Sequence, residues 1–176
     1  MHILGLILAV LAAGGVWWWR IKAAGEAANS AADVAGRLWG KHKRRKFLNK
    51  VEDSPLAVID DPATAAVVLM HVAAMEDGPI SPVKETTIRY EVVNTMQMLD
   101  PTEIITFGKW TATHATDSKS LMMRYGKIWN ENLTTKERGD LVAMVERVML
   151  AGQSALATDQ RARLDFLKQR LGLVVK

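Results

Sequence analysis

The longest uninterrupted apolar stretch of the chain covers residues 3–19, close to its start. It contains no charged residue and ends in three consecutive tryptophans. As a helix it would rise about 1.5 Å per residue, roughly 26 Å in all, which is the short end of a bilayer span. Tryptophans at the end of such a stretch are typical of a membrane–water interface. The pattern therefore predicts a single transmembrane helix over 3–19.

A cleaved signal peptide is the alternative for this stretch. It would require a basic region before the apolar run, where only Met1 and His2 stand. The small residues Ala12, Ala13 and Gly14 resemble a cleavage site, but the tryptophans follow almost directly. We therefore favour an uncleaved span.

Basic residues are concentrated directly after the apolar stretch. Residues 20–50 carry nine Lys and Arg against two acidic residues, a net charge of +7, whereas residues 51–176 carry −3. The positive-inside rule then places the N-terminus outside a bacterial inner membrane and the C-terminal domain in the cytoplasm. We expect the interface with lipid headgroups to consist of Trp17, Trp18, Trp19, Arg20, Lys22, Lys41, Lys43, Arg44, Arg45 and Lys46.

The same basic cluster has a nucleic-acid patch as its alternative interpretation. Only Trp39 and Phe47 accompany it as aromatic residues, and no other feature of a nucleic-acid-binding domain is present. We therefore favour the lipid bilayer as the partner and expect no nucleic acid.

Beyond residue 60, apolar residues recur at helical spacing, without convincing period-two alternation. A capping side chain directly before a proline is typical of a helix start. This pair occurs three times, at Asp61-Pro62, Ser81-Pro82 and Asp100-Pro101. We predict an all-α domain of about six helices over 61–173, after a basic juxtamembrane helix over 20–50 and a linker over 51–60.

Two later helices have their own start signals. Thr134 and Glu137 fit a capping box, and Thr158 or Asp159 begins a last helix that Gly172 ends. Helical periodicity selects a set of residues that we expect to face the core. They are Val68, Val72, Met75, Ile88, Val92, Thr95 or Met96, Leu99, Ile104, Gly108, Ala112, Leu121, Tyr125, Ile128 or Trp129, Leu141, Met144, Val145, Val148, Met149, Leu164, Leu167 and Leu171.

The residue composition limits the kinds of functional site that the chain can form. The chain has no cysteine, which excludes a disulfide framework, a thiolate metal site and a cysteine nucleophile. His71 and His114 are isolated from any serine or carboxylate at a telling spacing, so we expect packing or surface histidines and no enzyme. The eight methionines that follow Met1 indicate adaptable core filling rather than a soft binding groove.

One motif carries a family resemblance. Residues 73–85 read AAMEDGPISPVKE, in which a helix ends at Asp77-Gly78, Ile80 packs the turn and Ser81 caps the next helix. This resembles the A-x-x-D-G-x-[I/V]-S-x-x-E signature of the tellurite-resistance TerB family, over roughly residues 60–173. A span, a basic stretch and this domain together resemble membrane-anchored DnaJ-like proteins of the DjlA type, without their J domain.

The resemblance implies a helical bundle with two pseudo-symmetric halves. Setting Ala74 against Ala151 aligns the halves, and the second then has Ser154 and Ala155 in place of Asp-Gly. Some TerB members bind a divalent metal ion near these turns.

Carried over to this sequence, the resemblance implies Asp77 as a metal ligand, with Glu85 and Glu76 beside it as further candidates and calcium, magnesium or manganese as the ion. Lys84 occupies the position of the family's first-turn acid. A hard cation wants about six oxygen ligands, more than three carboxylates supply by themselves. We therefore favour structural roles, in which Asp77 shapes the turn and Glu85 lies at the positive end of a helix.

The expected function is a non-enzymatic, membrane-anchored adaptor. It would bind an unidentified protein partner at the cytoplasmic face of a bacterial inner membrane. The resemblance adds a role in envelope or tellurite and metal stress. The alternative is a divalent metal-ion sensor centred on the Asp77 turn.

Overall fold

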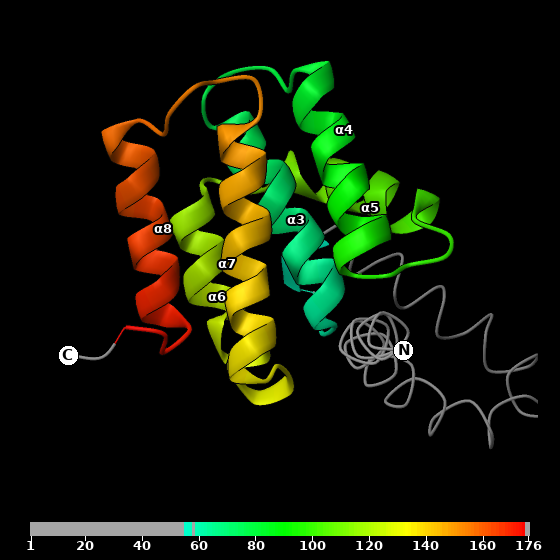
Figure 1. Ribbon diagram of the computed structural model, residues 1–176. Helices are drawn as coiled ribbons and strands as arrows, with labels where there is room; N and C mark the ends of the chain where they lie inside the picture. The colour runs from blue at the N-terminus through cyan, green and yellow to red at the C-terminus, as the bar shows by residue number, and fades with distance from the viewer. Residues whose placement is uncertain (1–54, 58, 175–176) are drawn as a thin grey trace, which may run out of the picture.

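The computed structural model describes residues 55–57 and 59–174, and every regular element in these ranges is helical (Figure 1). A short 3-10 helix, η1 (Pro55–Ala57), comes first. Six α-helices follow: α3 (Pro62–Met75), α4 (Pro82–Tyr90), α5 (Thr102–Ala112), α6 (Ser118–Asn132), α7 (Thr135–Leu150) and α8 (Thr158–Arg170). A five-residue π-helix, η2 (Glu91–Thr95), continues α4. The prediction of an all-α domain with about six helices is confirmed for this part of the chain.

Several helix starts lie where the sequence predicts them. Asp61 caps α3, and Ser81 caps α4 by accepting a hydrogen bond from the Lys84 backbone. The capping box of Thr134 and Glu137 forms at α7. Each cap satisfies backbone N–H groups that a helix leaves without a partner at its first turn.

The third predicted start is displaced by one residue. Pro101 takes the capping position of α5 and makes no side-chain cap. Asp100 Oδ1 instead accepts a hydrogen bond from the Thr102 backbone at 3.2 Å. Proline therefore directly precedes this helix rather than occupying its first turn.

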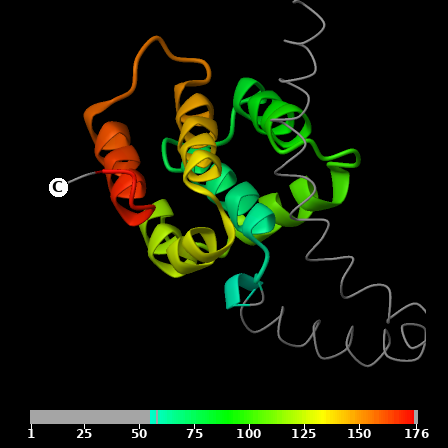
Figure 2. The ribbon, with the colours of Figure 1, turned by 60° about the horizontal axis from the view of Figure 1, so that its bottom comes forward.

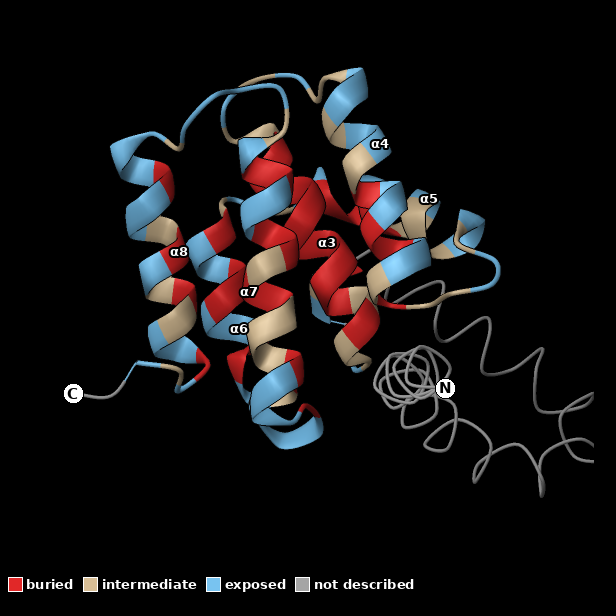
Figure 3. Cartoon of the chain, in the orientation of Figure 1, coloured by how far each residue is buried: buried red, intermediate tan, exposed pale blue. Residues whose placement is uncertain are grey.

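Helix α3 lies in the middle of the domain, between α4 and α5 on one side and α6 and α8 on the other (Figures 1 and 2). It is apolar all round, as is typical of a helix surrounded by others. Its buried residues are Ala63, Ala65, Ala66, Val67, Val68, Leu69, Met70, His71, Val72, Ala73 and Ala74, and Figure 3 shows α3 as a largely buried helix.

A glycine sets the distance between α3 and α5. Gly108 is buried in α5, and a Cβ atom there would lie 2.6 Å from Val67 Cγ1 of α3. Real Cβ atoms essentially never approach a neighbour so closely. The absence of a side chain at Gly108 thus lets the two helices cross in close contact.

The prediction that Leu99 faces the core is wrong. Its side chain is 88% exposed, whereas Ile88, Val92 and Met96 are buried as expected. The helical spacing does not extend to Leu99 because the π-helix ends at Thr95. A π-helix also has more residues per turn than an α-helix, so the face of α4 does not continue in register.

Part of the stretch expected as a linker packs against the domain. Pro55 and Ile59 are buried, and the Leu56 carbonyl accepts a hydrogen bond from Tyr125 Oη at 2.7 Å. The predicted span over 3–19, the basic helix over 20–50 and their interfacial tryptophans and basic residues lie outside the described residues. Among the residues that are described, none of the helices combines the length and apolarity of a membrane span.

Candidate functional site

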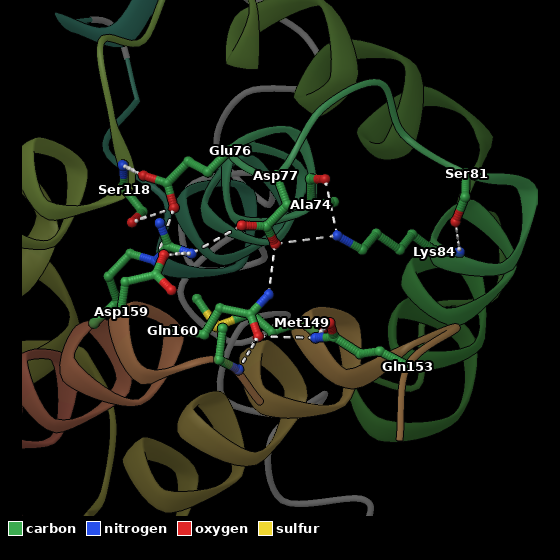
Figure 4. Close-up of polar contacts among 12 residues, drawn as sticks. Ala74, Glu76, Asp77, Ser81, Lys84, Ser118, Met149, Gln153, Asp159 and Gln160 are labelled. Atoms are coloured by element: carbon green, nitrogen blue, oxygen red, sulfur yellow. Dashed lines mark hydrogen bonds and ion pairs between the residues drawn. The ribbon is translucent and has the colours of Figure 1, made fainter. Parts of the chain in front are cut away.

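The carboxylate of Asp77 lies in the turn after α3 and is held by side chains from two other helices (Figure 4). Its Oδ2 accepts a hydrogen bond from Gln160 Nε2 at 2.6 Å and lies 3.4 Å from Lys84 Nζ. Its Oδ1 lies 3.2 Å from Arg163 Nη2. The turn between α3 and α4 is therefore joined to α8, more than 80 residues later in the chain.

Glu76 joins the same cluster to α6. Its carboxylate accepts hydrogen bonds from the backbone N–H and the hydroxyl of Ser118, at 2.7 and 2.9 Å. Arg163 Nε lies 3.3 Å from Glu76 Oε2, an ion-pair distance at which the N–H is not aligned as a hydrogen bond. Arg163 also pairs with Asp77 and Asp159, so one guanidinium is shared by three carboxylates.

The turn between α7 and α8 lies beside the turn of Asp77 (Figure 1). Gln160 connects the two turns, because its Oε1 accepts hydrogen bonds from Gln153 and from the Ala157 backbone while its amide donates to Asp77. The second turn has a glycine with positive φ after all, at Gly152. The sequence alignment of the two halves had set Gly78 against Ala155, three residues after Gly152.

The surroundings of Asp77 determine the protonation state of its carboxylate. Burial raises the pKa of Asp77, but the hydrogen bond from Gln160, the charge of Lys84 and the hydrogen bond from Arg163 together lower that pKa below its usual value. The side chain is therefore ionised at neutral pH, with its charge balanced by two cations.

The predicted metal ligands divide into two places. Glu76 and Asp77 share Arg163, whereas Glu85 lies on α4 and accepts a hydrogen bond from Lys109 of α5. Within the described ranges, no three or more histidine or acidic side chains gather as a metal-ion site would require. A divalent metal site at this turn stays an untested alternative to the structural roles of these residues.

Two cavities lie in the groove between α4 and α5. The turn cavity has a volume of about 360 Å³ and is lined by Met75, Gly78, Pro79, Ile80, Glu85, Lys109 and Thr113. The histidine cavity has a volume of about 380 Å³ and is lined by His71, Pro82, Glu85, Thr86, Arg89, Ile105 and Lys109. Glu85 and Lys109 line both cavities, so their ion pair stands at the boundary between them.

His71 is the buried polar residue of this groove, with only 2% of its surface exposed. Its Nδ1 lies 2.8 Å from the Val67 carbonyl oxygen. Since a carbonyl can only accept, Nδ1 carries the proton and Nε2 presents a lone pair. Burial lowers the pKa of His71; the bond to Val67 opposes this effect, and the charge of Lys109 adds to it. His71 is therefore neutral at neutral pH.

Sequence reasoning missed this groove. His71 stands far from Glu85 and Lys109 in the chain, and no motif spacing connects the three. The available signal was a lone histidine on a helix that is otherwise apolar all round. Such a residue needs a hydrogen-bond partner inside the fold.

Sequence reasoning also missed a buried charge elsewhere in the domain. Glu91 of η2 is fully buried and accepts two hydrogen bonds from the Arg147 guanidinium of α7, at 2.6 and 2.8 Å. Thr95 donates a further one at 2.6 Å. The hydrogen bond to Glu91 raises the pKa of Arg147. This pair fastens the π-helix to the neighbouring helix and lies away from both cavities.

The solvent side of α4 carries exposed apolar side chains. Val83 and Tyr90 are 53% and 59% exposed, and Val93 of η2 is 40% exposed. Val83 and Tyr90 are seven residues apart, close to two helical turns, so they lie on one face. We call Val83, Tyr90 and Val93 the α4 stripe.

Comparison with known proteins gives no match to any protein-family model, to any curated protein or to any solved structure. The resemblance to the TerB family therefore rests on the motif at residues 73–85 and remains a prediction.

Proposed function

We propose that this chain is a non-enzymatic adaptor, anchored by residues 3–19 in a bacterial inner membrane, whose helical domain binds a protein partner in the cytoplasm. The observation that carries the proposal is the α4 stripe. Membrane anchoring is proposed from the sequence of the N-terminal residues, and a TerB-like role in envelope or tellurite stress is proposed from the Asp77 turn motif alone.

The α4 stripe has the chemistry of a protein-binding surface. Tyr90 offers a large apolar ring with a polar tip, and tyrosine is enriched at interfaces for this reason. Val83 of α4 and Val93 of the adjoining η2 add to the exposed apolar surface, while Ile88 on another side of α4 is fully buried. The α4 stripe therefore does not contribute to the core of this domain. Binding to an apolar surface of a partner would remove these side chains from water, which is favourable.

Site-specific crosslinking in cells tests the adaptor. A photoreactive residue replaces Tyr90 in the full chain, and the control variant carries it at Glu131, an exposed position of α6. We expect one adduct of defined size at the Tyr90 position and none at Glu131. Adducts of equal yield at both positions, or none at Tyr90, would contradict a docking surface on α4.

Fractionation tests the anchor separately. We expect the full chain to stay in the membrane pellet after an alkaline wash, since a transmembrane helix resists extraction that removes peripheral proteins. A chain that begins at residue 51 should appear in the supernatant. Recovery of the full chain in the supernatant would refute the membrane span.

A further inference from the structure

The histidine cavity is lined by a buried histidine, one of whose ring nitrogens forms no hydrogen bond with the residues that the structure describes. His71 is almost completely buried, and its Nδ1 is bonded to Val67. In the described part of the chain, the hydrogen bond of the His71 ring is the one at Nδ1, and Nε2 forms none. His71 lines the cavity, and Nε2 is the ring nitrogen that its bond to Val67 leaves available for a ligand. A neutral histidine with a free Nε2 offers a lone pair and therefore selects a ligand that donates a hydrogen bond.

Cations line the same cavity. Arg89 on α4 is exposed and makes no ion pair or hydrogen bond with the residues that the structure describes. Lys109 donates one N–H to Glu85, and an ammonium group has two more to give. With Glu85 counted, the lining keeps one net positive charge. The cavity therefore favours an anion that also carries a proton to donate.

We infer that the histidine cavity binds a phosphate monoester group. In its singly protonated form this group combines anionic oxygens, for Arg89 and Lys109, with a P–O–H group for His71 Nε2. The second pKa of such a group is about 6, so the proton is present in a sizeable fraction near neutral pH. Carboxylates and sulfate esters are anionic without a proton to give, so they satisfy the cations and leave Nε2 without a partner.

The remaining space suits an organic substituent. The volume of about 380 Å³ exceeds the roughly 30 Å³ share of one water many times over. Ile105 and Pro82 supply apolar lining beside the charged groups. Soluble phosphate esters and the headgroup of a phosphatidic acid lipid share this chemistry. The site lies in the groove between α4 and α5, so it is independent of the adaptor proposal.

Two small anions of the same shape test the site. The full chain, in a phospholipid-free non-ionic detergent at about pH 6, is titrated with methyl phosphate and with methyl sulfate by calorimetry. At this pH about half of the methyl phosphate is in its singly charged form, which matches methyl sulfate in charge, and only this form carries a P–O–H group. We expect methyl phosphate to bind about tenfold more tightly, the effect of one hydrogen bond to a charged group. Equal affinities, or no heat from methyl phosphate at about 10 mM, would overturn the inference.

Variants separate the contributions. His71→Phe should bring the affinities for the two anions to the same value, because it removes the lone pair. Arg89→Gln, an exposed change that leaves the core intact, should weaken binding of both anions. If His71→Phe does not fold, the Arg89→Gln variant still tests the inference. Unchanged affinities in Arg89→Gln would also overturn the inference.

A third titration identifies the source of the phosphate. Dioctanoyl phosphatidic acid and dioctanoyl phosphatidylglycerol compete with methyl phosphate in the same detergent. Phosphatidylglycerol is a phosphodiester and has no P–O–H group. Stronger competition by phosphatidic acid than by methyl phosphate itself assigns the site to a lipid headgroup. Competition no stronger than that of methyl phosphate assigns it to a soluble ester. Stronger competition by phosphatidylglycerol than by phosphatidic acid would overturn the inference.

Discussion

The crossing of α3 and α5 can be tested with one methyl group. In Gly108→Ala the new Cβ would lie 2.6 Å from Val67 Cγ1, about 0.8 Å short of the 3.4 Å at which ordinary contact begins. Val67 is fully buried, and valine in a helix has one strongly preferred rotamer, so it has no free direction in which to turn. The two helices must therefore move apart.

The magnitude follows from two opposing effects. Overpacking of this kind costs about 1–3 kcal/mol. Alanine is a better helix former than glycine, which returns about 0.5–1 kcal/mol. We expect Gly108→Ala to lower the free energy of unfolding by about 1–2 kcal/mol, measured by urea denaturation monitored by circular dichroism.

Gly139→Ala in α7 is the matched control. A Cβ at Gly139 meets no atom within 4 Å, so only the helix-propensity gain remains. We expect this variant to be more stable than the wild type by up to about 1 kcal/mol. The two substitutions are chemically identical and should have opposite signs. A Gly108→Ala variant that gains stability like the control would refute the close crossing of α3 and α5.

Three further predictions concern the charged clusters. Arg147→Met should lower the free energy of unfolding by about 2 kcal/mol, as measured by urea denaturation. The loss is smaller than for a fully buried ion pair because Arg147 is half exposed. It should exceed the loss in Glu91→Gln, because Arg147→Met leaves the buried charge of Glu91 without a partner. Asp77→Asn should destabilise the domain at neutral pH. The pKa of Asp77 is lowered in the folded chain, so the wild type should exceed the variant in free energy of unfolding by the full amount above about pH 5. This difference should disappear as the pH falls through the pKa of Asp77 in the folded chain. Denaturation at several pH values measures it. Calcium or manganese should leave the melting midpoint unchanged, because Lys84 and Arg163 already balance Asp77; a rise that Asp77→Asn abolishes would establish a metal site.

Local signals predicted the helices well because helix starts depend on neighbouring residues. Asp61 and Thr134 cap helices through backbone groups three residues away, so a short stretch of sequence contains the whole interaction. The prediction at Leu99 was wrong because it assumed uninterrupted α-helical spacing. The buried Glu91 pairs with Arg147, which comes 56 residues later, and no local pattern indicates the π-helix that contains Glu91.

The candidate sites were less accessible to sequence reasoning. The sequence motif drew attention to Asp77, but its partners Gln160 and Arg163 come from the last helix and no local pattern indicates them. The groove needs residues from α3, α4 and α5 at once. Gly108 was expected to face the core, and the structure adds that its missing side chain brings α5 close to His71.

The apolar surface on all sides of α3 has a consequence for folding during synthesis on the ribosome. Its 14 residues are made before every helix that covers them, and α7 is complete only at Leu150. At about 5–20 residues per second, the ribosome needs roughly 4–15 s to supply those 75 residues. Until α7 is made, α3 is an incompletely covered apolar segment, the kind of surface that chaperones bind and that aggregates. Chains that terminate before α7 should therefore be insoluble and rapidly degraded.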